Sequence, residues 1–216
     1  TYLSKGLTPF VPQVFDERRI KQIISRFGCG IAGHLVYLRD KSLYFFKSEG
    51  KDQVFFMYRR KQEKLFCIGE PIGNPKYFKE ALEDFLKTAD LYGFEPVFYD
   101  IDQDFTLLLH EYGYDFLQIG EKGLVDLEKF NLHGEKHHNQ RALINRFAND
   151  GYVLDLLKPP YCEVLLSEMR KVSDDWLSNR TEKGFSVGFF DEYYLEQGSL
   201  MTLRDSSGKL KAFSSI

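Results

Sequence analysis

Several features that mark specialised classes of protein are scarce or missing in this sequence. Its 216 residues contain only three cysteines, which lie far apart: Cys29, Cys67 and Cys162. An odd and scattered set of this kind is typical of reduced thiols in a cytosolic setting, and it argues against a disulfide framework or a zinc site. No run of about 18 apolar residues occurs, so the sequence predicts no membrane-spanning helix within its length.

The sequence also lacks an overall positive charge. Its 29 basic and 32 acidic residues give a formal net charge of −3, which argues against a protein that binds nucleic acid over its whole surface. Any polyanion would therefore have to meet a local basic patch. The hydrophobic content of 43% and charged content of 28% fit a folded protein. The aromatic content of 16% suits β-rich cores or apolar ligand surfaces.

The first half of the sequence predicts strands and two helices. Residues 34–46 have the pattern of two strands around a turn at Asp40-Lys41, and residues 53–69 predict a second hairpin. The clearest helix follows Asn74, which suits an N-cap. Later elements are expected in this order: a strand at 95–101, a helix at 104–113 capped by Asp104, and two strands within 114–127.

The second half predicts a smaller set of elements. We expect a strand at 151–157, a helix after Pro159-Pro160, a polar loop at 178–190 and a hairpin around Ser206-Ser207-Gly208. The helix has an apolar stripe formed by Leu165, Met169, Val172 and Trp176. Because the chain starts at Thr1 and stops within a predicted strand, we expect a fragment whose second α+β unit is incomplete.

A basic helix is predicted between these two units. The stretch GEKHHNQRALINRF, residues 134–147, contains five basic or imidazole side chains: Lys136, His137, His138, Arg141 and Arg146. At helical spacing the apolar residues Leu143, Ile144 and Phe147 share one face, and the basic and amide residues spread over the opposite face. Arginine and lysine neutralise phosphates, and asparagine and glutamine can contact sugar or base edges.

One simpler interpretation of this helix stays open at this point. Charged helix faces are usually only solvated, so the basic face need not bind anything. His137 and His138 are adjacent and therefore point about 100° apart on a helix, which makes a shared metal ion unfavourable. We expect no metal site here.

The sequence is similar to a known family in the region that follows the helix. The motifs that carry the similarity are NRFANDGY, LKPPY, VSDDWLSNRTEKGFSVGFFDEYYL and KAFSSI, and the stretch around Asp175-Trp176-Leu177 and Lys183-Gly184-Phe185-Ser186 is the most specific. Together with GEPIGNP they resemble the aminoacyl-phosphatidylglycerol synthases, the multiple peptide resistance factor family, over most of residues 34–216. The family tends to have Gly-Asp-Pro where this sequence has Gly69-Glu70-Pro71.

The resemblance implies a fold and a domain organisation. It implies α+β class, with tandem acetyltransferase-like (GNAT) folds at residues 1–130 and 151–216, joined by the basic linker helix at 131–150. The second fold is expected to be truncated. Family members are bacterial cell-membrane proteins, and this part of them is soluble and faces the cytoplasm.

The resemblance also implies an activity. The family transfers an amino acid, most often lysine, from aminoacyl-tRNA to phosphatidylglycerol, and the cationic lipid product repels cationic antimicrobial peptides. Expected partners are therefore lysyl-tRNA, phosphatidylglycerol and the membrane surface, with the basic helix holding the tRNA acceptor stem. No metal or nucleotide cofactor is required. The family's Asp-x-x-Arg type motif has no equivalent here, so we expect the catalytic residues beyond residue 216 and an inactive fragment.

Three further residues are candidates for lipid or phosphate contact. Arg180 and Lys183 lie in the polar loop, where they could clamp a phosphate of lipid or tRNA, and Phe185 could line an apolar slot for acyl chains together with Phe189 and Phe190. An ordinary solvated loop with a packed phenylalanine is the alternative. Two other functions also stay open: tRNA-dependent transfer of an amino acid to a cell-wall peptide precursor, and a non-catalytic RNA-binding module.

Overall fold

The computed structural model describes residues 12–216, and these divide into two compact units. The first unit contains the chain up to Phe116 together with Lys183–Phe189, and the second contains Leu117–Glu182 and Phe190–Ile216. Each unit has helices packed on a β-sheet, so the predicted mixed α+β class is confirmed. The finer expectations, tandem GNAT folds with boundaries at 130/131 and 150/151, stay predictions.

The first unit is built on a five-stranded sheet in the order β1-β2-β3-β5, with β4 paired to β2. The strands are β1 (Ser42–Ser48), β2 (Lys51–Lys61), β3 (Lys64–Ile68), β4 (Ile72–Gly73) and β5 (Glu95–Tyr99). Strands β2 and β3 pair antiparallel, which confirms the hairpin predicted within residues 53–69. Strand β5 pairs parallel to β3, and the helix between them makes the crossover that a parallel pair requires.

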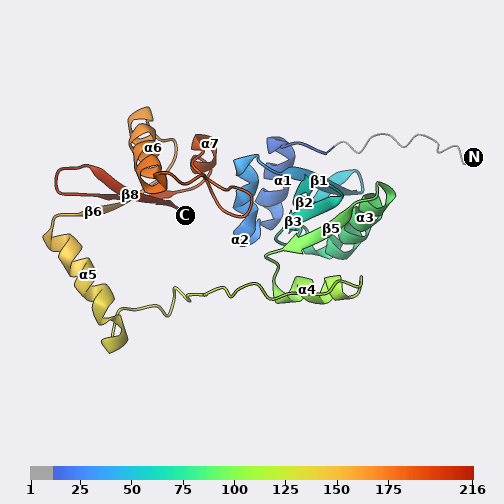
Figure 1. The fold of residues 1–216 in the computed structure, drawn as a ribbon, viewed down its shortest axis with the longest axis horizontal. Coiled ribbons are helices and arrows are strands. Elements are labelled where there is room, and N and C mark those ends of the chain that lie inside the picture. Colours follow the sequence, from blue (N-terminus) through green and yellow to red (C-terminus); the bar gives the residue numbers. More distant parts are fainter. Residues whose placement is uncertain (1–11) are drawn as a thin grey trace, which may run out of the picture. The chain divides into compact units, whose positions relative to one another are not determined.

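That crossover helix was the clearest prediction from the sequence. The side chain of Asn74 accepts a hydrogen bond from the Lys76 amide and begins a 3₁₀ turn, η2 (Pro75–Tyr77), which leads into α3 (Phe78–Leu91). Gly93, at φ +70°, follows its end. Helix α3 lies on the sheet (Figure 1) and buries an apolar stripe formed by Ala81, Leu82, Phe85 and Ala89.

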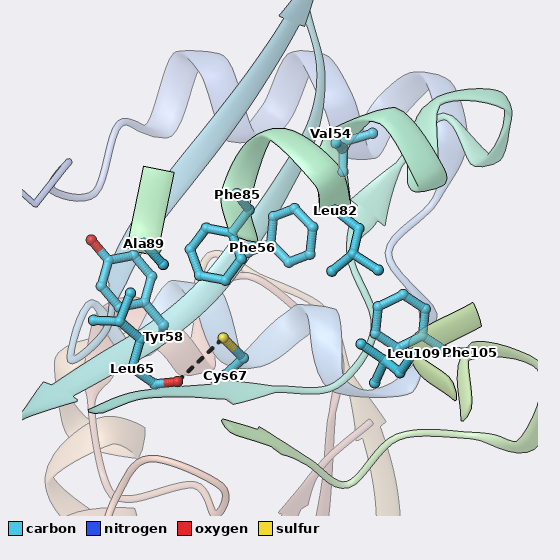
Figure 2. Packing of buried hydrophobic residues seen from close by; sticks show 11 residues of the cluster. Val54, Phe56, Tyr58, Leu65, Cys67, Leu82, Phe85, Ala89, Phe105 and Leu109 are labelled. Atoms are coloured by element: carbon cyan, nitrogen blue, oxygen red, sulfur yellow. Dashed lines mark hydrogen bonds between the residues drawn. The ribbon is translucent and has the colours of Figure 1, made fainter. Parts of the chain in front are cut away.

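The core of the first unit lies between α3 and one face of the sheet. Figure 2 shows Phe85 of α3 stacked on Phe56 of β2, with ring centroids 4.8 Å apart and planes 13° from parallel. Tyr58, Leu65 and Cys67 complete this layer with almost no exposed surface. Burial raises the pKa of the Cys67 thiol, so this cysteine stays neutral.

The other face of the sheet is covered as well. Residues 53–58 of β2 are buried without a break, which is typical of a strand packed on both sides. Helix α1 (Glu17–Phe27) contacts β2 and β4 and buries Ile20 and Ile23. A short helix, α2 (Gly30–Gly33), and a 3₁₀ helix, η1 (His34–Leu38), lead from α1 into β1.

The structure corrects three predictions between residues 34 and 127. The first strand of the hairpin expected at 34–46 is wrong, because residues 34–38 form the 3₁₀ helix η1 and bury three consecutive side chains, whereas the second strand is present as β1. Helix α4 (Gln103–His110) is capped by Asp102 and not by Asp104. No strand forms within 114–127, where Leu117, Leu124 and Leu127 are more than 80% exposed.

The second unit has a three-stranded antiparallel sheet in the order β6-β7-β8. Its elements are η3 (Glu135–His137), α5 (His138–Asn149), β6 (Val153–Leu157), α6 (Glu163–Leu177), α7 (Glu192–Leu195), β7 (Leu200–Arg204) and β8 (Leu210–Ser215). The predicted helices, first strand and last hairpin are therefore confirmed. Figure 1 shows α6 against this sheet, where Leu165 and Met169 pack near Leu200 and Leu210. Trp176 does not join this core, since it is 69% exposed.

Candidate functional site

The basic helix predicted between the units is present as η3 and α5. None of the residues of α5 is buried, and Lys136, His138 and Arg146 are exposed. Leu143 and Ile144, expected on a packed face, are 47% and 52% exposed. This arrangement leaves the cationic side chains of Lys136 and Arg146 accessible to a polyanion, and α5 is amphipathic without being covered by the other described residues.

Two of the five predicted tRNA-binding residues make contacts within the protein. Nη1 of Arg141 donates hydrogen bonds to the backbone carbonyls of Leu132 and Gly134. His137 packs edge to face against Phe130, with ring centroids 6.0 Å apart. Both side chains therefore fix the segment that leads into α5. Arg141 uses only Nη1 in these bonds, and Nε and Nη2 are the remaining donors of its guanidinium group.

The candidate residues for lipid or phosphate contact are divided between the units. Arg180 belongs to the second unit, where its guanidinium carbon lies 5.2 Å from the centre of the Trp176 ring. Lys183 and Phe185 belong to the first unit, on the segment Lys183–Phe189. Lys183 is exposed and Phe185 is partly buried. The structure thus brings Lys183 and Phe185 together on one segment, with Arg180 in the other unit.

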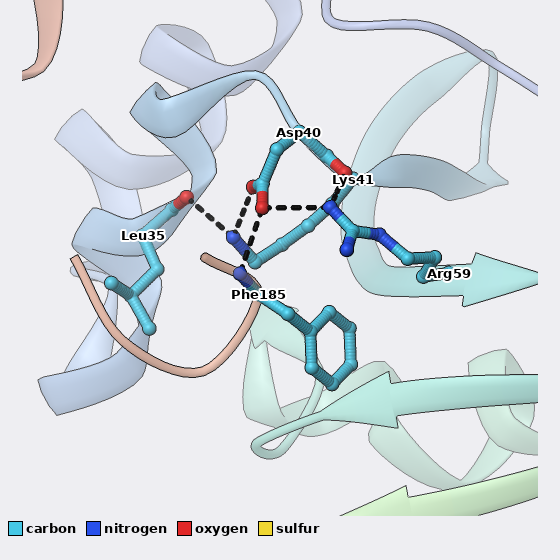
Figure 3. A network of polar contacts seen from close by, with 5 residues as sticks. All are labelled: Leu35, Asp40, Lys41, Arg59 and Phe185. Carbon is cyan, nitrogen blue, oxygen red and sulfur yellow. Dashed lines mark hydrogen bonds and ion pairs between the residues drawn. The ribbon is translucent and has the colours of Figure 1, made fainter. Parts of the chain in front are cut away.

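A polar cluster that sequence reasoning missed holds this segment. Figure 3 shows the carboxylate of Asp40 between Lys41, Arg59 and Phe185. Oδ2 of Asp40 accepts hydrogen bonds from the Phe185 amide at 2.8 Å and from Nη2 of Arg59 at 2.9 Å. Oδ1 accepts from Nζ of Lys41, which also donates to the carbonyl of Leu35 at 3.1 Å. Contacts between residues 145 positions apart leave no local pattern, so the sequence offered no signal for this cluster.

The charges of the cluster do not cancel. The single carboxylate of Asp40 pairs with two cations. The side chain of Lys41 is only 1% exposed, and the side chain of Arg59 is 47% exposed. Burial lowers the pKa of Lys41, and the hydrogen bond to Asp40 opposes that shift. The guanidinium carbon of Arg59 lies 5.6 Å from the centre of the Phe185 ring. Arg59 is therefore the more accessible of the two cations to a ligand.

The second unit has an open groove between α6 and β8. Its volume is about 810 Å³, and Lys171, Trp176, Lys209, Lys211 and Phe213 are among the residues that line it. Nζ of Lys211 pairs with Asp205 at 3.3 Å, so part of the positive charge in the groove is already neutralised. The groove has a mixed lining, with no single sign of charge.

The described residues contain neither a cluster of metal ligands nor a membrane-spanning helix. Among residues 12–216, no three His, Cys, Asp or Glu side chains gather as a metal ion would require. No helix of the same residues is both long enough and apolar enough to cross a bilayer. Cys29, Cys67 and Cys162 are all free thiols.

Comparison with known proteins gives consistent matches over almost the whole chain. The family model described as phosphatidylglycerol lysyltransferase, C-terminal, matches residues 22–216. The phosphatidylglycerol lysyltransferase of Staphylococcus epidermidis strain RP62A is 39% identical over 194 residues, which are 90% of this chain and 23% of that protein. The protein of the same name in Bacillus subtilis strain 168 is 34% identical over 201 residues, 93% of this chain and 23% of that protein.

A solved structure agrees with these matches. The structure of L-PGS from Bacillus licheniformis superposes with a TM-score of 0.90 at 33% identity, and the match covers 95% of this chain and 64% of that one. The chain spans about a quarter of the length of the curated relatives it matches. A family model that covers residues 22–216 and relatives named for one enzyme give one conclusion: the chain belongs to the family of the phosphatidylglycerol lysyltransferase C-terminal region.

Proposed function

We propose that the protein to which this chain belongs transfers an amino acid, most often lysine, from aminoacyl-tRNA to phosphatidylglycerol. The observation that carries the proposal is the identity of 34–39% with proteins named phosphatidylglycerol lysyltransferase, over 90% or more of this chain. The acetyltransferase-like folds, the domain boundaries at 130/131 and 150/151, and an inactive fragment belong to the same proposal. So do attachment of the whole protein to the bacterial cell membrane, a cytoplasmic position for this region and resistance to cationic peptides.

The reaction is an ester exchange. A hydroxyl oxygen of the lipid's glycerol headgroup attacks the carbonyl carbon of the aminoacyl ester, and the bond from that carbon to the ribose oxygen breaks. The proton of the attacking hydroxyl is removed, and a proton is delivered to the leaving ribose oxygen. Such a reaction needs a general base, donors for the tetrahedral oxyanion and alignment of two bulky substrates. We place the catalytic groups beyond residue 216.

In this proposal α5 and the turn before it hold the tRNA. Lys136, His138 and Arg146 are exposed and are assigned direct contacts with phosphates and sugars. Arg141 and His137 hold the entry to α5, and Arg141 adds a phosphate contact through its remaining donors. Arg180, Lys183 and Phe185 are assigned to the lipid or a phosphate. The local basic surface accounts for polyanion binding by a chain with a net charge of −3.

The test is a transfer reaction with the full-length protein in detergent. Lysyl-tRNA carrying labelled lysine is incubated with phosphatidylglycerol vesicles, and the lipid fraction is extracted and counted. The proposal predicts labelled lipid that depends on phosphatidylglycerol and is absent with phosphatidylcholine.

Other outcomes of that reaction overturn the proposal in different ways. If the label enters a cell-wall peptide precursor and not lipid, the acceptor is the peptide precursor and the proposed acceptor is wrong. If the label stays on intact tRNA, with lysine and alanine both tried and the protein folded, the protein is an RNA-binding module that transfers no amino acid.

A further inference from the structure

The guanidinium group of Arg59 is fixed at one end and open at the other. Its Nη2 atom donates to the carboxylate and to the carbonyl of Asp40, at 2.9 and 2.8 Å. Among residues 12–216, all hydrogen bonds found for this side chain use Nη2, and the side chain is 47% exposed. Nε and Nη1 are therefore a pair of donors with a set direction, which is the geometry that suits two oxygens of a phosphate.

The backbone beside Arg59 is held in an unusual conformation. Gly184 and Phe185 both have positive φ, +65° and +64°. A residue with a Cβ atom rarely adopts this conformation, because the Cβ atom comes close to the backbone, so Phe185 needs compensation. The hydrogen bond from its amide to Asp40 supplies it, and a Cβ atom on Gly184 would lie 3.1 Å from the same carboxylate oxygen. Asp40 thus fixes both the orientation of the Arg59 guanidinium group and the path of the segment that contains Lys183.

The surroundings of Arg59 combine cationic and apolar groups. The guanidinium lies near the Phe185 ring, and Phe189 packs beside Gly184. Lys183 is exposed on the same segment. A phosphodiester next to glycerol and acyl carbons has both an anion for the cations and apolar surface for the rings. The cations assigned to RNA lie instead on η3 and α5, in the other unit.

We propose that Arg59 binds the phosphodiester of the anionic phospholipid substrate, and that Asp40 is a positioning residue that fixes Arg59 and the Lys183–Phe185 segment as one binding surface. The proposal rests on the proposed function, since it names residues for its lipid. It adds Arg59 and Asp40, both in the first unit, to the loop residues already assigned to the lipid.

The experiment measures lipid affinity without turnover. Full-length protein in a neutral detergent is titrated by calorimetry with dihexanoyl-phosphatidylglycerol, and in parallel with dihexanoyl-phosphatidylcholine, inorganic phosphate and uncharged tRNA. Replacing Arg59 by Ala should raise the Kd for the phosphatidylglycerol about tenfold, because it removes charge-assisted hydrogen bonds. The Kd for tRNA should stay within about twofold.

Arg170 provides a matched control. It also pairs with one carboxylate, that of Glu192, lies over a phenylalanine ring, Phe190, and has a side chain 52% exposed. Arg170→Ala should leave the Kd for phosphatidylglycerol within about twofold.

Several results would overturn the inference: a wild-type protein that does not bind the phosphatidylglycerol, an Arg59→Ala variant with unchanged lipid affinity, or equal losses in both arginine variants. An effect of Arg59→Ala confined to inorganic phosphate or to tRNA would overturn the assignment to lipid.

A double-mutant cycle tests the role of Asp40. Asp40→Asn should raise the Kd for phosphatidylglycerol, and it should add little to Arg59→Ala because Asp40 acts through Arg59. Fully additive effects would contradict a positioning role. If Asp40→Asn does not fold, Asp40→Glu replaces it in the cycle, because it keeps a charge for Lys41 and moves the carboxylate.

These results separate the inference from the proposed function. Normal labelling of lipid with no effect of Arg59→Ala would remove the inference alone. If Arg59→Ala loses lipid affinity but the wild-type protein transfers no amino acid, the proposed function is wrong and the lipid site stands.

Discussion

At the scale of single residues, Asp40 and Lys41 have roles that their sequence positions conceal. An Asp-Lys pair between apolar residues has the pattern of a hairpin turn, and the sequence predicted one. In the structure Lys41 is buried, and its ammonium group is satisfied by Asp40 and by the carbonyl of Leu35. A buried charge persists only with partners of this kind, and one of the groups around Asp40 comes from position 185. Local patterns therefore predicted the candidate residues Lys183 and Phe185, but not the groups that hold them.

Asp205 gives a pH-dependent prediction at the same scale. Its Oδ1 atom accepts hydrogen bonds from the hydroxyl of Ser207 at 2.6 Å, the amide of Ser207 at 3.0 Å and the amide of Lys209 at 3.0 Å. These bonds, with that of the Ser207 hydroxyl the largest, lower the pKa of Asp205 to about 2. Because this pKa lies below the value of about 3.9 in an unfolded chain, the stabilisation is complete above about pH 4. It is lost as the pH falls through about 2.

A carboxyl-carbon NMR titration should therefore give a midpoint of about 2 for Asp205. Ser207→Ala should move the midpoint upward. A wild-type midpoint near 3.9 would contradict the hydrogen-bonded turn.

At the scale of secondary-structure elements, prediction succeeded where the local signals agreed with one another. The segment that leads into helix α3 begins with an Asn N-cap and a proline, both at the turn η2, and α3 itself has an apolar stripe and a glycine after its end. The segment 114–127 has only alternating apolar residues. A strand needs a partner for its backbone groups, and none forms with this segment among residues 12–216. Periodicity alone was therefore insufficient there, as it was at residues 34–38.

The packing of α3 on the sheet gives a stability prediction. Phe85 stacks on Phe56, and its ring centroid lies 5.0 Å from that of Tyr44 and 6.0 Å from that of Tyr58. Phe85→Ala should lower the free energy of unfolding by about 3–5 kcal/mol, because it removes buried surface and leaves a cavity. Urea denaturation followed by circular dichroism measures the loss.

The control for this prediction is Leu91, the last residue of the same helix, which is 58% exposed. Leu91→Ala should change the free energy of unfolding by no more than about 0.5 kcal/mol. Equal losses in the two variants would show that α3 does not dock through Phe85.

At the scale of the whole molecule, charge is distributed unevenly in a way that composition hides. The chain has a net charge of −3, yet Lys136 of η3 and Arg146 of α5 are exposed, and neither element has a buried residue. The segment 183–189 belongs to the first unit, although the residues before and after it in the sequence belong to the second. The basic helix follows from local sequence and was predicted. The place of this segment in the first unit depends on tertiary contacts such as that of Phe185 with Asp40, which local sequence patterns do not predict.

In the proposed function the basic helix holds the tRNA that donates the amino acid. The most direct measurement is the rate of lysine transfer to phosphatidylglycerol by the full-length protein, as a function of lysyl-tRNA concentration and of salt. Replacing Lys136, Arg141 and Arg146 with Glu should raise the KM for lysyl-tRNA at least about tenfold at low salt and flatten its salt dependence, because fewer counterions are released. The kcat should stay within about twofold.

The matched control reverses three basic residues of another helix. Arg18, Lys21 and Arg26 are exposed on α1, and replacing them with Glu changes the net charge by the same amount. This variant should keep the KM and salt dependence of the wild type. An unchanged KM in the α5 variant, or equal increases in both variants, would contradict a tRNA site on the basic helix.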